Sequence, residues 1–227
     1  MATVVTDLYP HRMWLRGRPD LFCVPSDWSK EILLGRRPKA EAVVTGIPIS
    51  SEFRPSVAHG PRRVLVTSGG ISGGPVLEVV RALARLPLDL HVVTGWNESL
   101  RHSLEEDPAL AGVTVLGHLD QAQMAEAMGG AALIVGKPGG LTTMESLAVG
   151  TPFVVFKPFM IPGQEERNAQ FLSESGAGIG VGDVQQLCAQ VATLLDAPDR
   201  LASMRAAAAA NGRPDAAANV VRTLEAR

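Results

Sequence analysis

The sequence predicts an α/β protein built on a doubly wound parallel sheet, and three observations support this prediction. From residue 63 onward, short apolar runs alternate with longer stretches of helical character. Glycine, proline or polar residues follow the runs, as is usual where a buried strand ends. Hydrophobic residues make up 46% of the 227-residue chain, which is enough for a sizeable core. In such sheets ligands bind at the carboxyl ends of the strands.

The first part of the chain predicts the end of a sheet rather than a complete domain. Its apolar runs predict three strands, at residues 3–6, 21–24 and 42–45. A helix from Ser26 to about Leu34 lies between the second and third runs. No strand–helix unit precedes the first run to flank these strands. We therefore expect residues 1–53 to be the remnant of an N-terminal domain, followed by a breaker-rich linker at residues 54–62.

Residues 63–227 predict a second sheet together with its covering helices. The expected strands are residues 64–67, 90–94, 113–116, 131–135, 153–156 and 179–181. Helices are expected between these strands and over most of the chain after residue 181. Unusual residues follow five successive strands: Gly69, Gly70 and Gly73; Trp96 and Asn97; His118; residues 137–142; and residues 162–165. This clustering at one sheet edge indicates a ligand site.

The most informative stretch joins the strand at residues 131–135 to the helix at residues 141–149. Between them lies the glycine-rich turn Lys137-Pro138-Gly139-Gly140. A helix N-terminus that follows such a turn presents unpaired backbone N–H groups and the positive end of a helix dipole, so it favours phosphate. Glu145 lies one turn into the helix, where a carboxylate suits sugar hydroxyls. The residues indicate a nucleotide diphosphate, although such a turn is also common as a purely structural element.

Two other phosphate-binding patterns do not fit. The P-loop pattern G-x-x-x-x-G-K-[ST] is absent from the sequence. The segment Ser68–Gly74 follows a strand and opens a helix, but its glycines are spaced G-G-x-x-G-G rather than G-x-G-x-x-G. The acidic residue expected at the end of the next strand is replaced by Thr94-Gly95-Trp96. A nicotinamide or flavin dinucleotide is therefore a weak interpretation.

Charge and cysteine content narrow the class of protein further. The net charge of −2 argues against nucleic acid as a partner. The first 63 residues are basic and the remainder is acidic, which suits either an anionic membrane surface or an ordinary solvated face. Cys23 and Cys188 lie in apolar segments, so we expect buried thiols rather than a disulfide or a metal site. We expect a cytoplasmic protein at most peripherally attached to the inner face of the membrane, because neither a signal peptide nor a long apolar segment is present.

Several motifs together resemble a known family. They are Val5-Thr6-Asp7 with His11 and Trp14, residues 20–26, residues 44–50, Ser68-Gly69-Gly70, residues 137–142 with Glu145, and residues 162–165 with Asn168. These motifs are similar to those of the diacylglycerol glycosyltransferases, which include monogalactosyldiacylglycerol synthase and the processive diacylglycerol glucosyltransferases. The peptidoglycan N-acetylglucosaminyltransferase belongs to the same clan, but Lys137-Pro138-Gly139 favours the glycolipid branch. Gly136 departs from the pattern, which usually has Thr or Arg there.

The resemblance implies a GT-B architecture, in which two Rossmann-like domains face each other across a cleft. The C-terminal domain would bind a UDP-sugar, UDP-glucose or UDP-galactose, as co-substrate, with no cofactor and no metal. The resemblance implies these donor-binding residues: Gly69, Gly70, Gly73, Asn97, His118, Leu119, Lys137, Gly139, Gly140, Leu141, Thr142, Glu145, Pro162, Gly163, Gln164, Glu165 and Asn168. Glycines would contact the diphosphate, Glu145 the ribose, residues near His118 the uracil, and Gln164 and Glu165 the donor sugar.

Some of these residues have structural alternatives. Asn97 would also serve as the N-cap of the next helix, and His118 as an ordinary loop histidine. His11 and Trp14 are candidates for the acceptor side, although Trp14 equally suits a packing role. The acceptor would be diacylglycerol or a related lipid, and the catalytic base would lie in the N-terminal half that this chain lacks.

The function therefore has a leading hypothesis and three alternatives. The chain is expected to be the donor domain of a glycolipid hexosyltransferase, weakly active or inactive alone. One alternative is a transferase of the muropeptide type that uses UDP-N-acetylglucosamine. Another is a non-catalytic nucleotide-sugar-binding subunit of a split glycosyltransferase, with its acceptor domain on a separate chain. A sugar-nucleotide epimerase of related architecture is the third, although no group of carboxylates demands it.

Overall fold

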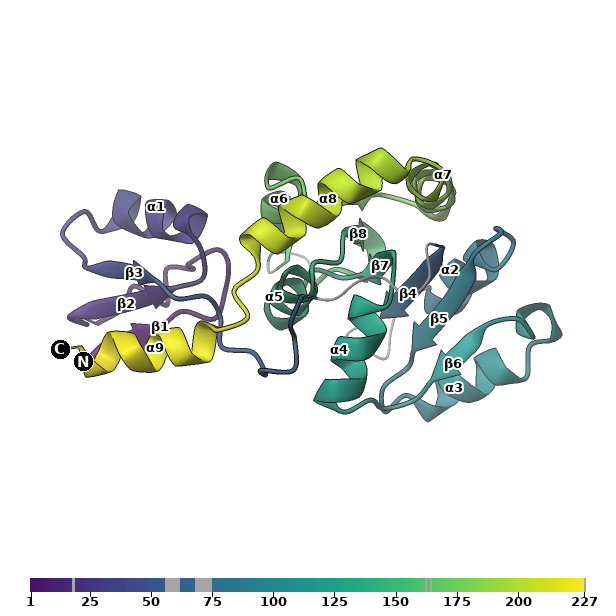
Figure 1. The fold of residues 1–227 in the computed structure, drawn as a ribbon, viewed down its shortest axis with the longest axis horizontal. Coiled ribbons are helices and arrows are strands. Elements are labelled where there is room, and N and C mark those ends of the chain that lie inside the picture. The colour runs from purple at the N-terminus through teal and green to yellow at the C-terminus, as the bar shows by residue number, and fades with distance from the viewer. Residues whose placement is uncertain (18, 56–61, 68–74, 162, 164, 227) are drawn as a thin grey trace.

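The computed structural model describes residues 1–17, 19–55, 62–67, 75–161, 163 and 165–226. It confirms the predicted α/β class, with parallel strands gathered into two separate sheets. The smaller sheet and the larger sheet lie at opposite ends of the molecule's long axis, and helices cover both (Figure 1). No described helix is both long enough and apolar enough to cross a lipid bilayer.

The larger sheet has the strand order β6-β5-β4-β7-β8-β9. Its strands are β4 (Arg63–Thr67), β5 (Asp89–Val93), β6 (Thr114–Leu116), β7 (Leu133–Gly136), β8 (Phe153–Phe156) and β9 (Gly178–Val181). All neighbouring pairs are parallel. The chain first winds outward from β4 to β6 and then returns to continue from β7 to β9. The topological switch point of this doubly wound sheet therefore lies between β4 and β7.

Alternating side chains of each strand divide the core into two layers. Val64 and Val66 of β4 contribute to one layer, and Leu65 contributes to the other. The first layer is covered by α2 (Val76–Leu83), α3 (Glu98–Glu105) and α7 (Val184–Leu195). The second is covered by α4 (Gln121–Gly129), α5 (Gly140–Val149) and α6 (Glu166–Glu174). Helix α8 (Pro198–Asn211) contributes Met204 to the first layer and Ala208 to the second.

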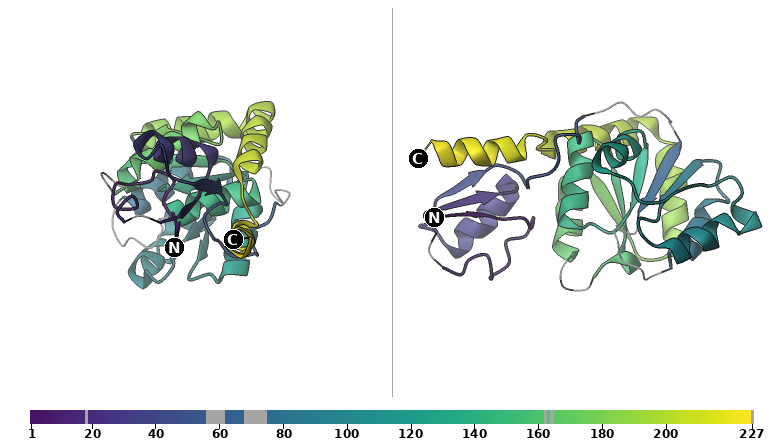
Figure 2. Two further views of the ribbon diagram at one scale, coloured as in Figure 1. Left: turned by 90° about the vertical axis from the view of Figure 1, so that its left-hand side faces the viewer. Right: turned by 90° about the horizontal axis from the view of Figure 1, so that it is seen from below.

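The smaller sheet is formed by β1 (Ala2–Val4), β2 (Leu21–Val24) and β3 (Ala42–Val44), in that order. Helix α1 (Asp27–Arg36) packs on one face, where its Leu33 joins Phe22 and Val24. The C-terminal helix α9 (Ala216–Glu225) covers the other face, where Val220 contacts Leu21 and Cys23. Figure 2 shows α9 beside this sheet, away from the larger one. The predicted domain boundaries remain a prediction, and α9 lies spatially with the N-terminal strands.

Two short 3₁₀ helices, Pro108–Leu110 and Lys157–Phe159, complete the described elements and were not expected from the sequence. Each has proline near its start, where the fixed φ of the ring suits a tight helical turn. The two cysteines are present as thiols. Cys23 is buried in β2 of the smaller sheet, and Cys188 is half-buried on α7, which covers the larger sheet. The expectation of thiols is confirmed, and that of full burial holds for Cys23 only.

Gly212, just after α8, marks a close approach between two helices. A Cβ at this position would lie 3.1 Å from Ala148 Cα and still closer to the Leu147 carbonyl oxygen of α5. We expect Gly212→Ala to lower the free energy of unfolding by about 1–3 kcal/mol, because α5 and α8 must separate. Urea unfolding followed by circular dichroism measures this. Gly35→Ala in α1 is the matched control: no described atom lies within 4 Å of the place where its added methyl group would sit, so alanine should stabilise the helix.

Candidate functional site

The N-terminus of α5 follows β7 directly, next to the switch point of the larger sheet. Gly139 is the N-cap residue, and no side chain caps the helix among the described residues. The first bond along the helix runs from the Thr143 N–H to the Gly139 carbonyl oxygen over 2.8 Å. The N–H groups of the first turn, which begins at Gly140, therefore have no acceptor within the helix. This arrangement is suited to an anion.

A buried ion pair holds the turn before α5. Lys137 Nζ lies 3.0 Å from Glu165 Oε1, and the two side chains are only 12% and 8% exposed. The other carboxylate oxygen, Glu165 Oε2, accepts a 2.8 Å hydrogen bond from the Ile161 N–H. Asn168 Nδ2 donates to the Pro138 carbonyl oxygen over 2.9 Å. The turn at residues 137–139 is therefore fastened to the start of α6, which brings together Lys137, Glu165 and Asn168, three of the residues that the resemblance implied for the donor.

A cavity of about 1050 Å³ opens between this turn, the start of α6 and the loop after β1. Gly139, Gly140, Gly163, Glu165 and Asn168 line one side of it. His11 and Trp14, the predicted acceptor-side residues, line the other side. Asp7, Tyr9, Met13, Glu166, Arg167 and Gln170 complete the lining. The cavity thus contains both residues implied for the donor and the two candidates for the acceptor side.

The loop after β1 is held by its own side chains. Trp14 Nε1 donates a 2.6 Å hydrogen bond to Asp7 Oδ2, so Trp14 both packs against the small core and orients a carboxylate in the cavity. The Met13 N–H donates to His11 Nδ1 over 3.3 Å. A neutral His11 therefore carries its proton on Nε2 and is a hydrogen-bond donor at that atom. Asp7 was part of the sequence motif, but its contact with Trp14 could not be read from the sequence.

An aromatic cluster joins this loop to α6. Trp28 of α1 lies between Tyr9 and Phe171, with ring centroids 6.0 Å and 5.7 Å away. Trp28 Nε1 also donates to Glu174 Oε2 over 3.1 Å. The Arg167 guanidinium lies over the Tyr9 ring, 4.9 Å from its centroid. Tyr9 and Arg167 were not predicted as cavity residues, because their contact joins segments about 160 positions apart in the sequence.

Two acidic side chains near the site, Glu145 and Glu166, have pKa values shifted in opposite directions. Burial of Glu145 on α5 raises the pKa of its carboxyl group, and no described group donates a hydrogen bond to it. Glu166 differs, because the Gly163 N–H donates to its carboxylate over 2.7 Å and lowers the pKa of that group. Glu145 is thus a half-buried acceptor one turn inside α5, whereas Glu166 is already engaged in closing its own turn. Leu141 is exposed and Thr142 half-buried at the start of α5.

The ends of β5 and β6 carry the remaining described candidates. Asn97 caps α3, since its Oδ1 accepts a 3.0 Å hydrogen bond from the Leu100 N–H. The capping alternative is therefore confirmed for this residue. His118 follows β6 and stacks against the ring of Trp96, while Leu119 packs against the core beside α4. The remaining predicted residues, Gly69, Gly70, Gly73, Pro162 and Gln164, lie outside the described residues.

The structure explains the glycine at position 136, where the resembling family usually has a larger residue. A Cβ on Gly136 would lie 2.6 Å from the Thr67 carbonyl oxygen and 3.4 Å from the Phe153 ring. Both neighbours belong to strands that flank β7. The end of β7 is therefore too crowded for any side chain in this protein.

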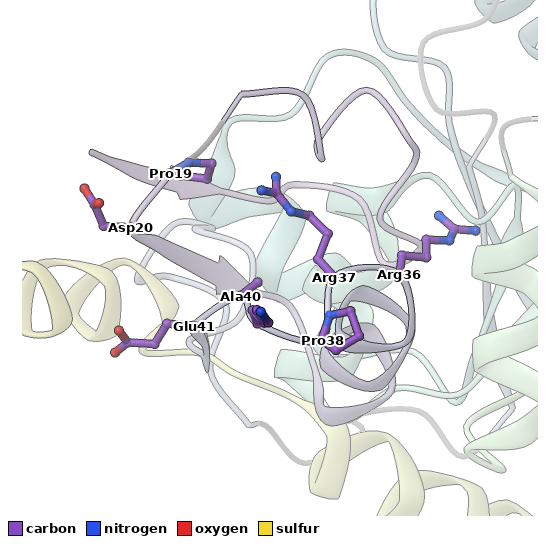
Figure 3. A pocket seen from close by; sticks show the side chains of 8 residues that line it. Pro19, Asp20, Arg36, Arg37, Pro38, Ala40 and Glu41 are labelled. Atoms are coloured by element: carbon purple, nitrogen blue, oxygen red, sulfur yellow. The ribbon is translucent and has the colours of Figure 1, made fainter.

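A second hollow of about 630 Å³ lies at the amino ends of β2 and β3, where the loop after β1 enters β2. Figure 3 shows Arg36 and Arg37 at one end of it and Asp20 and Glu41 at the other. Both arginines serve the loop: Arg36 donates to the Pro10 carbonyl oxygen over 2.7 Å, and Arg37 to Leu15 and Gly17 over 2.9 Å each. We therefore assign this hollow a structural role. In the described part of the chain, no group of three His, Cys, Asp or Glu residues is placed to bind a metal ion.

Known proteins resemble this chain in sequence and in fold. Residues 76–220 match the glycosyltransferase family 28 C-terminal domain. The chain belongs to this family. The matched segment contains the N-terminus of α5, Glu145, the Lys137–Glu165 pair and the Trp96–His118 stack. The predicted family resemblance is thereby confirmed.

The similar proteins extend this result. A processive diacylglycerol beta-glucosyltransferase of Bacillus subtilis (strain 168) is 33% identical over 89% of this chain and 56% of its own length. The crystal structure of Acinetobacter baumannii MurG matches 100% of this chain and 67% of its own, with a TM-score of 0.70 and 20% identity. A UDP-GlcNAc 2-epimerase from Neisseria meningitidis, bound to UDP-GlcNAc, matches 92% and 61% with a TM-score of 0.67 and 16% identity. The family 28 chain spans 56–60% of the length of the curated relatives that it matches.

Proposed function

We propose that this family 28 chain binds a UDP-sugar, UDP-glucose or UDP-galactose, for transfer of the hexose to diacylglycerol or a related lipid. The observation that carries the proposal is the shared cavity. The unpaired N–H groups of α5 lie on one side of it, and the loop with Asp7, His11 and Trp14 lies on the other. The cavity volume of about 1050 Å³ is at the upper limit of the volumes that ligand clefts occupy. The named B. subtilis relative supports the lipid acceptor.

The proposed chemistry is a single displacement at the anomeric carbon. The hydroxyl oxygen of the acceptor forms a bond to this carbon while the bond from the carbon to the diphosphate oxygen breaks. The charge that develops on the leaving diphosphate is stabilised by the N–H groups and dipole of α5. The acceptor proton passes to a general base. We place this base in the part of the curated relatives that this chain does not span, so the chain alone would bind donor and transfer slowly.

Different residues would contact different parts of the donor. Glu145 would accept hydrogen bonds from the ribose hydroxyls, since its carboxylate is half-buried and has no described donor. Lys137, Glu165 and Asn168 would contact the donor hexose at the start of α6. The acceptor hydroxyl would enter beside His11 and Trp14. A transferase of the muropeptide type would bind UDP-N-acetylglucosamine at the same donor site. The preferred sugar therefore decides between the glycolipid and muropeptide branches.

Calorimetric titration with UDP, UDP-glucose, UDP-galactose and UDP-N-acetylglucosamine tests the proposal. We expect Glu145→Ala to weaken UDP binding about tenfold, because hydrogen bonds to a carboxylate are lost. Burial raises the pKa of Glu145, so wild-type affinity should begin to fall at a higher pH than for an ordinary glutamate when the solution is acidified. The Glu145→Ala variant should lack this loss on acidification.

The matched control is Glu225→Ala, an exposed glutamate at the end of α9, which covers the small sheet. It should bind UDP as the wild type does. A wild-type chain that binds none of the four nucleotides would contradict the proposal. Tight binding of UDP-N-acetylglucosamine alone would instead support the muropeptide branch.

A further inference from the structure

Two aromatic side chains form an exposed stack at the edge of the larger sheet. Trp96 follows β5 and His118 follows β6, and their ring centroids are 3.9 Å apart with planes inclined by 17°. Trp96 is nevertheless 79% exposed. His118 therefore covers one face of the indole, and the opposite face remains open. An indole with one face covered and the other open offers a flat apolar surface on which a second ring can stack.

The turns that carry this stack are firmly anchored. The N–H and the hydroxyl of Thr94 both donate to the Leu116 carbonyl oxygen, over 2.8 Å and 3.2 Å. The Asn97 N–H donates to the Thr94 carbonyl oxygen over 3.1 Å, so Trp96 lies inside a closed turn. Gly95 supplies the positive φ of 59° that this turn requires. The backbone that carries the indole is thus fixed by its own hydrogen bonds, and the stack on His118 orients the ring.

The His118 side of the stack is anchored as well. Asp120 caps α4, accepting a 2.8 Å hydrogen bond from the Gln123 N–H, and Gln123 Oε1 accepts one from the Asp120 N–H. This reciprocal capping box fixes the residue two positions after His118. Both rings therefore belong to preorganised turns, which lowers the entropy lost when a ligand binds.

The strand order decides which part of an extended ligand reaches this stack. The proposed phosphate site, at the N-terminus of α5, follows β7. The cavity with Glu165 lies on the β8 side of this site, at the start of α6. Trp96 and His118 lie on the other side, beyond β4, at the carboxyl ends of β5 and β6. A sugar nucleotide with its diphosphate at α5 and its hexose in the cavity therefore directs its nucleoside toward β4 and β5.

We infer that Trp96 is the stacking platform for the nucleobase, which lies on the open face of the indole while His118 supports the other face. This inference rests on the proposed function and adds to it a residue that fixes the nucleoside end of the donor. Stacking of a base on an aromatic ring is favourable for every base. Trp96 therefore contributes affinity for nucleotides in general and does not select among bases.

Calorimetry with UDP, ADP and inorganic pyrophosphate tests the inference. We expect Trp96→Ala to weaken binding of UDP and ADP by a similar factor of about tenfold. Pyrophosphate, which has no base, should bind the variant and the wild type equally. Trp96→Phe should retain most of the nucleotide affinity, since a smaller ring still stacks. UDP should also quench the tryptophan fluorescence of the wild type, and Trp96→Phe should lose most of this quenching.

Each contrary outcome has a distinct meaning. Equal UDP binding by wild type and Trp96→Ala would overturn the stacking role and leave the proposed function intact. Loss of pyrophosphate affinity in Trp96→Ala by the same factor would also overturn it, because the side chain would then act only on the loop structure. A wild-type chain that binds neither UDP nor pyrophosphate would overturn both the inference and the proposed function. Val221→Ala, at a residue of α9 that is 52% exposed and far from this edge, should change none of these values.

Discussion

Replacement of Lys137 by methionine should lower the free energy of unfolding by about 3–5 kcal/mol, because it leaves a buried carboxylate without its counter-ion. Glu165 is 8% exposed, and one of its oxygens depends on Lys137 Nζ at 3.0 Å. Its other oxygen keeps the Ile161 N–H as donor, but one backbone hydrogen bond does not neutralise the charge. Urea unfolding of Lys137→Met, followed by circular dichroism, measures the loss.

A double-mutant cycle separates the ion pair from the packing of its side chains. Lys137→Met combined with Glu165→Leu should be less destabilising than the sum of the two single changes, since no buried charge remains. The exposed pair of Arg101 and Glu105, whose side chains are 43% and 46% exposed, provides the comparison. Arg101→Met should change stability by less than about 1 kcal/mol. A Lys137→Met protein as stable as Arg101→Met would show that the buried pair contributes nothing.

Gly139→Asp should lower the affinity for a diphosphate about 100-fold or more without unfolding the protein. The N-cap position has ordinary angles, φ −60° and ψ 149°, which any residue adopts. The nearest atoms to an added Cβ are Glu165 Oε1 at 3.7 Å and Thr142 Oγ1 at 3.8 Å, so the side chain fits. Its carboxylate would accept hydrogen bonds from the first turn of α5 and occupy the seat that we assign to phosphate.

Calorimetry with UDP and with pyrophosphate measures this effect, and thermal unfolding checks the fold. Aspartate is a favoured N-cap residue, but its carboxylate would lie near that of Glu165, so the two effects oppose each other and the melting temperature of Gly139→Asp should stay close to that of the wild type. Gly139→Asn has the same shape without the charge and should lose much less affinity. The seat would have to be placed elsewhere if Gly139→Asp bound UDP within tenfold of the wild type.

Much of the fold could be predicted because buried parallel strands give continuous apolar runs that breakers interrupt. Residues 153–156 were expected as a strand and form β8 with the same bounds. The first strand was expected at residues 3–6 but pairs only over Ala2–Val4, because partner strands, and not propensity, decide where pairing ends. The path of α9 could not be predicted, since its amphipathic pattern shows that it packs but not on which sheet.

The site could be predicted where it depends on local sequence and not where it depends on contacts between distant segments. The unpaired start of α5 follows from strand, glycine turn and helix in succession, and the structure confirms it. The ion pair of Lys137 with Glu165 joins two predicted residues, but their mutual contact was not predicted. Trp96 was noticed in the sequence only as an unusual residue at a strand end. Its stack on His118 requires β5 and β6 to be neighbours, which only the sheet order reveals.

The return of the C-terminal helix to the small sheet has a mechanical consequence. The chain passes between the two sheets twice, once after β3 and once between α8 and α9 (Figure 1). The two passages touch, since a Cβ on Gly46 would lie 2.7 Å from the side chains of both Arg213 and Ala216. The small sheet is therefore tied to the larger one at two adjacent points of the backbone, in addition to the contacts of Trp28 with Phe171 and Glu174. Two such connections restrict rotation of the small sheet about the chain, which a single connection would allow, and so preserve the spacing of the segments that line the cavity.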